Sequence, residues 1–78
     1  MKDKITIQYK DKPIPMRLIH GGGNPVGYKI TCPVCNKWSV MDFGIHNISS
    51  DLTIMPSLVC PHGCGWHVWV TNGIAVDC

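Results

Sequence analysis

Two short clusters of metal-ligating side chains constrain this chain more than any other feature of its sequence. The stretch CPVC supplies the first cluster, Cys32 and Cys35. A C-x2-C pair suits a tetrahedral zinc site, because a tight turn can aim both sulfur atoms at one point. The second cluster lies in CPHGCGWH and offers four candidates, which are Cys60, His62, Cys64 and His67. Two such turns joined by a β segment predict one metal site.

The length of the chain leads us to expect a metal, disulfides or a partner that stabilises the fold. With 78 residues it forms one domain whose apolar core alone gives marginal stability. The start, MKDKITIQYKDKP, has no apolar run followed by a cleavage site, so we expect a cytoplasmic protein. In a reducing compartment, clustered cysteines favour metal ligation over disulfides. No apolar run approaches the roughly 20 residues of a membrane span, and we therefore expect a soluble zinc protein.

The residues alone leave the second pair of ligands open. Cys60 and Cys64 form a C-x3-C turn whose following proline and glycine mirror CPVC and ease the bend. Cys64 and His67 form a C-x2-H turn whose spacing matches the first pair. His62 lies inside the turn, where we expect its side chain to face solvent. A rubredoxin-like iron site would need four thiolates, so the choice also bears on the metal.

The remaining sequence predicts a small all-β domain of antiparallel strands around a knuckle like that of a zinc ribbon. Ile5, Ile7 and Tyr9 alternate with polar residues, as in a half-buried strand. The stretch IPMRLI can return as a second strand, although Pro15 should confine it to an edge of the sheet. Near the end of the chain, Asn72-Gly73 predicts a β-hairpin, because both residues tolerate positive φ.

We divide the single domain, residues 1–78, into three parts. Residues 1–20 form an N-terminal hairpin, and residues 21–27 form a flexible glycine-rich loop, since three glycines and a proline interrupt regular structure. Residues 28–78 form the metal-binding β core. Cys78 is expected to be a free thiol at a frayed terminus.

The stretch PSLVCPHGCGWHVWVTNG resembles a family of small uncharacterised zinc-binding proteins of bacteriophages, some of which carry the misleading name ammonia monooxygenase. Longer relatives occur in bacterial operons beside ubiquitin-like proteins, their conjugation enzymes and a metallopeptidase. The resemblance covers residues 32–78 and implies the metal ligands Cys32, Cys35, Cys64 and His67. On this basis we take His67 as the fourth ligand and keep Cys60 as the alternative.

A closed four-ligand site leaves no position for an activated water, so a structural zinc in a non-enzymatic protein is the leading hypothesis. The resemblance implies a phage-encoded protein, and we expect it to bind a host or phage protein. Exposed edge strands and the short chain are compatible with a monomer or a homodimer. Trp66 and Trp69 are the candidate contact residues, because tryptophan is enriched among interface anchors.

Two other functions are weaker hypotheses. A zinc hydrolase or peptidase would act on a ubiquitin-like or other amide or ester substrate and would need an open metal position and a base. The chain has no Glu, so that base would be Asp42, Asp51 or His46. A nucleic-acid-binding zinc ribbon is unlikely by charge, since metal-bound thiolates reduce the formal net charge of +2 to between 0 and +1.

Overall fold

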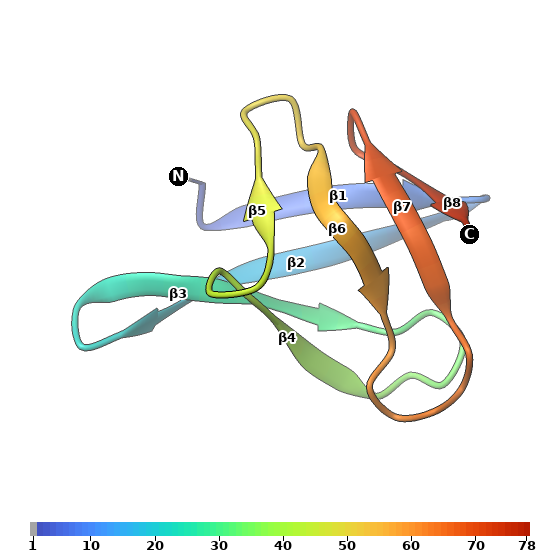
Figure 1. Ribbon diagram of the computed structural model, residues 1–78, viewed down its shortest axis with the longest axis horizontal. Coiled ribbons are helices and arrows are strands. Elements are labelled where there is room, and N and C mark those ends of the chain that lie inside the picture. The colour runs from blue at the N-terminus through green and yellow to red at the C-terminus, as the bar shows by residue number, and fades with distance from the viewer. Residues whose placement is uncertain (1) are drawn as a thin grey trace.

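The computed structural model describes residues 2–78 and contains eight β-strands (Figure 1). In chain order they are β1 Lys4–Tyr9, β2 Lys12–Gly21, β3 Asn24–Thr31, β4 Trp38–Asp42, β5 Asn47–Ile48, β6 Ile54–Val59, β7 His67–Thr71 and β8 Ile74–Asp77. They form one sheet in the order β4-β3-β2-β1-β8-β7-β6-β5. None of the described residues belongs to a helix that could span a membrane. The prediction of a small all-β domain is confirmed.

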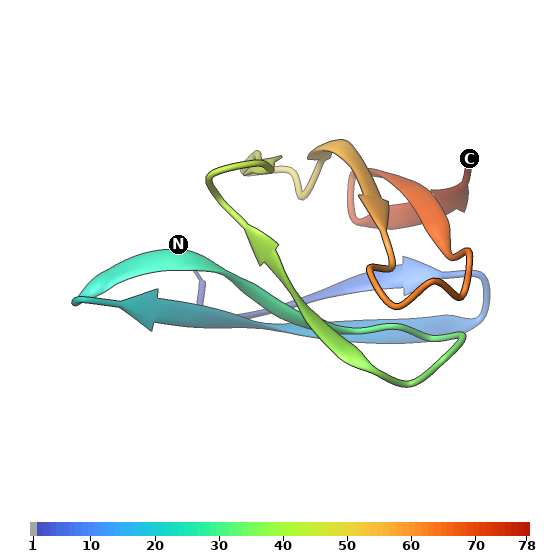
Figure 2. The same ribbon diagram turned by 60° about the horizontal axis from the view of Figure 1, so that its bottom comes forward.

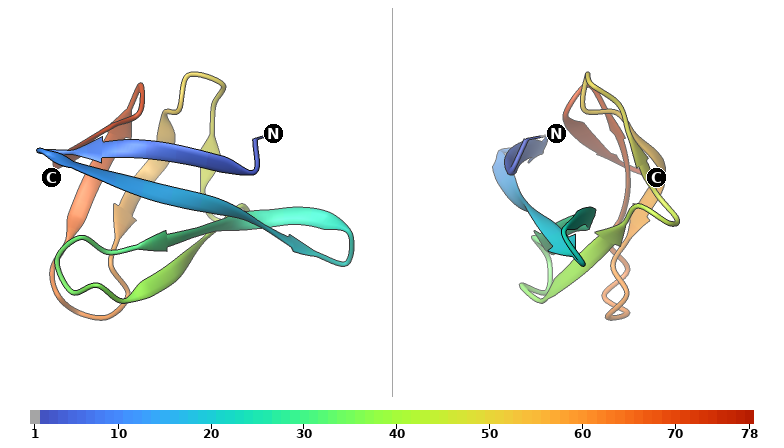
Figure 3. Two further views of the ribbon diagram at one scale, coloured as in Figure 1. Left: turned by 180° about the vertical axis from the view of Figure 1, so that it is seen from behind. Right: turned by 90° about the vertical axis from the view of Figure 1, so that its left-hand side faces the viewer.

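The sheet consists of two four-stranded antiparallel halves, β1–β4 and β5–β8. A short parallel pairing of β1 with β8 joins them, through the pairs Gln8↔Ile74 and Tyr9↔Ala75. Residues 43–46 connect β4 to β5, which lie at opposite ends of the strand order. The sheet therefore curls, and its two halves face each other across the core (Figures 2 and 3).

Alternating apolar side chains from both halves fill the core. The first half contributes Ile5, Ile7, Ile14, Met16, Tyr28, Ile30 and Met41, and the second contributes Ile54, Leu58, Trp66, Val68, Val70 and Ala75. The predicted face of β1 is confirmed, because Ile5 and Ile7 are buried and Tyr9 packs half-buried against them. Burial of each Ile, Leu, Val or Met side chain among them stabilises the fold by about 1.5–3 kcal/mol.

The second strand is not an edge strand, contrary to the expectation from Pro15. It lies between β1 and β3. However, it pairs with β1 over residues 12–17 and with β3 only from Met16 onward. Pro13 and Pro15 therefore lie where β2 has a neighbour on one side only, so their missing amide hydrogens remove no hydrogen bond to β3.

The glycine-rich segment is a tight hairpin rather than the expected flexible loop over residues 21–27. The strand β2 continues to Gly21, which pairs with Asn24 at the start of β3. Gly22 and Gly23 form the two-residue turn with φ of 61° and 85°, a conformation that glycine adopts without steric cost. Residues 4–31 thus supply the strands β1, β2 and β3 of the sheet. The hairpin predicted at Asn72-Gly73 is confirmed by φ of 52° and 78° there.

Candidate metal centre

The first cysteine turn connects β3 to β4. The backbone amide of Cys32 donates to the carbonyl of Lys37 at 3.0 Å, and the amide of Asn36 donates to the carbonyl of Cys32 at 3.0 Å. The amide of Val34 donates to Cys32 Sγ at 3.4 Å. Asn36, the residue after Cys35, takes a positive φ of 62°, which closes the turn and leaves both sulfur atoms on one side.

The second cysteine turn connects β6 to β7 and repeats this arrangement with one extra residue. The amide of Cys60 donates to the carbonyl of Trp66 at 2.9 Å, just as Cys32 donates to Lys37. Gly65, the residue after Cys64, has a φ of 87° and corresponds to Asn36. Gly63, with a φ of 80°, lies within the longer turn. A C-x3-C turn therefore presents its two sulfur atoms as the C-x2-C turn does.

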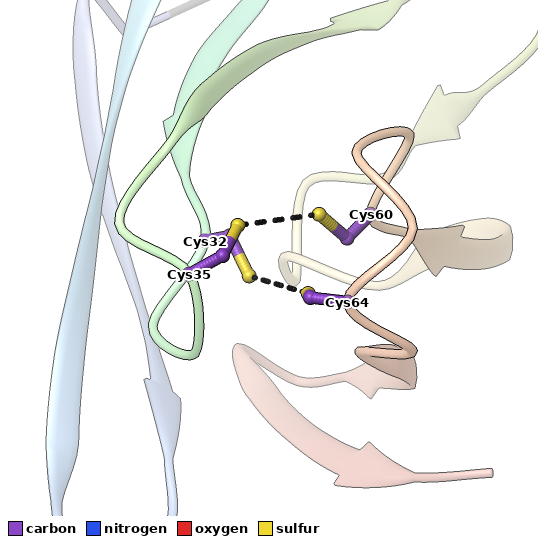
Figure 4. Close-up of side chains that lie close together, drawn as sticks. All are labelled: Cys32, Cys35, Cys60 and Cys64. Atoms are coloured by element: carbon purple, nitrogen blue, oxygen red, sulfur yellow. Dashed lines mark hydrogen bonds between the residues drawn. The ribbon is translucent and has the colours of Figure 1, made fainter.

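The two turns face each other and bring four sulfur atoms together (Figure 4). The sulfur atoms of Cys32 and Cys64 are 3.5 Å apart, and those of Cys35 and Cys60 are 3.7 Å apart. All four lie within 4.8 Å of one another. Four sulfur atoms at about 2.3 Å from one tetrahedral metal would be separated by about 3.8 Å. The four cysteines are free of disulfides and could hold a metal ion.

The cysteine cluster lies at the edge of the core. Cys32 and Cys60 are buried, whereas Cys35 and Cys64 are half-buried. Although desolvation opposes ionisation of Cys60, hydrogen bonds from the His62 amide and from neighbouring thiols lower its pKa to about 7. In Cys64, the Trp66 amide favours the thiolate, but desolvation and the neighbouring thiols raise the pKa to about 12. The proximity of the sulfur atoms thus disfavours several thiolates at once unless a cation neutralises them.

The structure places the alternative ligand Cys60 in the cluster and leaves the preferred ligand His67 outside it. His67 is the first residue of β7, in which Val68 and Val70 face the core, so alternation directs His67 outward. Its Nε2 lies 2.7 Å from Ser57 Oγ. Three of the four residues in the predicted set, Cys32, Cys35 and Cys64, therefore come together without it.

His62 is also outside the cluster, as the sequence suggested, but it does not simply face solvent. Its Nε2 lies 2.9 Å from the backbone carbonyl oxygen of Trp38 at the start of β4. Because His62 belongs to the second turn and Trp38 follows the first, this hydrogen bond links the two halves of the sheet beside the sulfur atoms.

The two predicted contact residues lie on opposite faces of their strand region. Trp66 is only 5% exposed, and its ring packs edge-on against Tyr9 with the ring centroids 5.6 Å apart. It is a core residue and cannot serve as a surface anchor. Trp69, in contrast, is 51% exposed on the outer face of β7. Alternation explains the difference, because Trp66 shares its phase with Val68 and Val70.

A small cavity of about 120 Å³ lies beside the cluster, between the edges of the two halves. Cys32, Cys60, His46 and Trp66 contribute to its wall, and no carboxylate does. Asp42 instead accepts a hydrogen bond from the amide of Gly44, and Asp51 accepts one from Ser49. His46 is thus the only one of the three candidate bases that lines the cavity.

Comparison of the chain with protein-family models, curated proteins and solved structures found no match. Membership of the phage zinc-protein family therefore stays a prediction. What the site can do follows from its own geometry and donor atoms.

Proposed function

We propose that this chain is a small zinc-binding protein in which the metal is structural, and that it acts as a binding module rather than as an enzyme. The observation that carries the proposal is the gathering of four cysteine sulfur atoms within 4.8 Å. Four protein ligands fill a tetrahedral shell and leave no position for a water or a substrate. Four thiolates also suit iron, so the metal content of the purified protein is part of the test.

The position of the cluster supports a structural role. Cys32 and Cys35 belong to the first half of the sheet, and Cys60 and Cys64 belong to the second. Apart from packing, the halves are joined by the short parallel pairing of β1 with β8, by the Lys10–Asp77 ion pair and by the His62–Trp38 hydrogen bond. A metal bound by both turns would therefore join the halves at the side of the core where the sulfur atoms lie.

The outer face of β6–β8 supports the binding role. Five large apolar side chains are more than half exposed there, and we call them the apolar face: Met55, Val59, Trp69, Ile74 and Val76. Trp69 and Val76 are directly paired across β7 and β8. Exposed apolar groups around a tryptophan are typical of protein interfaces. We propose a protein partner for this face, and the resemblance to phage proteins suggests a host or phage protein in the cytoplasm.

The hydrolase hypothesis receives no comparable support. A metal hydrolase needs an open metal position and a base near it. The cavity beside the sulfur atoms has no carboxylate in its wall. The fourth cysteine would occupy the coordination position that a catalytic water needs. His46 Nε2 lies 3.1 Å from the carbonyl oxygen of Ser57, so one of its nitrogen atoms is already engaged.

X-ray absorption at the metal edge of the purified protein tests the proposal. We expect zinc with four sulfur neighbours and no oxygen or nitrogen in the first shell. Three sulfur atoms and one imidazole would restore His67 as a ligand and still leave a closed site. Fewer than four protein ligands together with a water oxygen would contradict the structural role and favour the hydrolase.

A further inference from the structure

The cationic residues of this protein are confined to one half of the sheet. All seven Lys and Arg residues lie between positions 2 and 37, and residues 43–78 contain none. With three aspartates, residues 1–42 carry a formal charge of +4, whereas Asp51 and Asp77 give residues 43–78 a charge of −2. The formal net charge of +2 is the sum of two unlike halves, so it does not describe either surface.

The strand register aligns three of these cations in one row. Lys4 pairs with Arg17 across β1 and β2, and Arg17 pairs with Lys29 across β2 and β3. All three are exposed, and their chain neighbours Ile5, Met16 and Ile30 are buried. With strands about 4.8 Å apart, the row extends about 10 Å across the outer face. We call Lys4, Arg17 and Lys29 the basic row.

The basic row is not neutralised within the protein. Directly opposed like charges destabilise a β-sheet, and none of these three cations forms an ion pair. Among residues 2–78 the one ion pair joins Lys10 to Asp77, at 3.4 Å. Asp42, on the outer face of β4, uses its Oδ1 to accept the Gly44 amide. The three cations therefore repel one another, and an anion that lies across the row would relieve this repulsion.

An exposed aromatic ring lies beside the basic row. Trp38 is 58% exposed on the outer face of β4, where it pairs with Thr31. The Nζ atom of Lys29 lies 4.9 Å from the centroid of the Trp38 ring. Val40, two residues along the same strand, is paired with Lys29. A cation and a solvent-exposed indole thus occupy adjacent positions, the combination that holds phosphates and stacks bases in proteins that bind single strands.

We propose that the outer face of β1–β4 binds single-stranded nucleic acid. The basic row holds two or three consecutive phosphates, and Trp38 stacks on an unpaired base. The exposed ring favours unpaired bases over a duplex or an acidic peptide, which offer no free base to stack. This surface lies opposite the apolar face, so the inference goes beyond the proposed protein partner.

Fluorescence anisotropy of a labelled 12-nucleotide single strand, titrated with the zinc-loaded protein at several salt concentrations, tests the inference. Neutralisation of two or three phosphates predicts a slope of log K against log salt of about −1.4 to −2.1. Each of Lys4→Gln, Arg17→Gln and Lys29→Gln should reduce the magnitude of this slope by about 0.7. DNA and RNA strands of the same sequence show which backbone is preferred.

Two matched controls make the test specific. Lys12→Gln removes one positive charge, as the three substitutions in the basic row do. However, Lys12 pairs with Tyr9 and shares the phase of Ile14 and Met16 on β2, not that of Arg17. It should therefore leave the salt slope unchanged. Trp38→Ala should weaken binding about tenfold, whereas Trp69→Ala on the apolar face should not weaken it. Circular dichroism and zinc content verify the fold of each variant. No salt-dependent binding, equally tight binding of duplex DNA or polyglutamate, or no effect of Trp38→Ala would overturn the proposal.

Discussion

The sulfur atoms of Cys32 and Cys64 lie 3.5 Å apart, although these residues are separated by 32 positions and belong to opposite halves of the curled sheet. Cys35 and Cys60 make the second such approach, at 3.7 Å. The same four atoms would be a source of repulsion as thiolates and a source of stability around a divalent cation. The protein's stability should therefore depend on the metal.

Removal of zinc should lower the free energy of unfolding by several kcal/mol, because only the folded state brings the four ligands together. Urea unfolding with and without excess chelator measures the change. The tryptophan fluorescence, to which the buried Trp66 next to the second turn contributes, follows the unfolding. Zinc added back should restore the original midpoint. An unchanged midpoint in the chelator would show that the metal has no structural role.

Substitution of Cys60 should affect the metal more than substitution of His67. Cys60→Ser removes a ligand and should weaken zinc binding by more than the roughly 10–100-fold that loss of an outer-shell partner costs. His67→Ala removes a hydrogen bond with Ser57 on the outer face and should leave zinc affinity unchanged. Competition with a chromophoric chelator measures both variants. The reverse ranking would show that the C-x2-H turn holds the metal.

Three residues of the cysteine cluster could be predicted from local turns in the sequence. The choice between Cys60 and His67 as the fourth residue could not. CPVC identified Cys32 and Cys35 directly, and Cys64 belonged to both candidate pairs. The signal for Cys60 was present in the proline and glycine that follow its two cysteines. The C-x2-H turn has the same spacing as CPVC, and this favoured His67 as the fourth ligand. The sequence did not show that the positive φ of Gly63 accommodates the extra residue of the C-x3-C turn.

The fold shows the same division between local and distant information. Alternation of apolar and polar residues predicted the buried face of β1, and Asn72-Gly73 predicted the hairpin of β7 and β8. The parallel pairing of β1 with β8 joins residues more than 60 positions apart, and no local pattern encodes it. It determines that β4 and β5 are the edge strands. The strand β2, in contrast, is an inner strand because it pairs with its chain neighbours β1 and β3, and the expected loop over residues 21–27 concealed the hairpin with β3.

Charge was the property for which sequence reasoning was least informative. Lys4, Arg17 and Lys29 are far apart in the chain and form no run of basic residues. Only the register of β1, β2 and β3 aligns them. An expectation drawn from net charge, that nucleic acid is unlikely as a partner, therefore could not take this row into account.

The two tryptophans of the second half should respond differently to truncation. Trp66→Ala should destabilise the protein by about 3–5 kcal/mol, since it leaves a cavity in the core next to Tyr9. Trp69→Ala should change stability by less than about 0.5 kcal/mol and should weaken capture of a protein partner by the apolar face. Thermal unfolding and pull-down of the two purified variants separate these effects. Equal destabilisation would indicate that Trp69 packs against the protein itself.

Gly27 should be intolerant of substitution; it lies in strand β3, next to a register shift in the pairing with β2. A Cβ at this position would meet the backbone carbonyl oxygen of Met41 in the neighbouring strand β4. Because neither backbone can move freely, Gly27→Ala should cost about 1–3 kcal/mol. Gly21→Ala is the matched control, since its Cβ would meet only the side chain of Val26. Urea unfolding of both variants should show a clear loss for Gly27→Ala and a smaller one for Gly21→Ala.

Zinc affinity should rise with pH, and more steeply below about pH 7 than above it. Zinc binds thiolates, so each thiol that is protonated in the metal-free protein must lose its proton on binding. Cys64, with its pKa raised to about 12, is protonated throughout the neutral range. Cys60, with its pKa lowered to about 7, needs to lose a proton only in more acidic solution. Below pH 7 Cys60 therefore adds one proton to the number released when zinc binds.

Chelator competition at half-unit intervals from pH 6 to pH 8.5 measures the slope of zinc affinity against pH. An affinity that does not change with pH would show that the thiols are not the ligands. Cys78→Ser should reproduce the wild-type curve, because Cys78 lies outside the cluster.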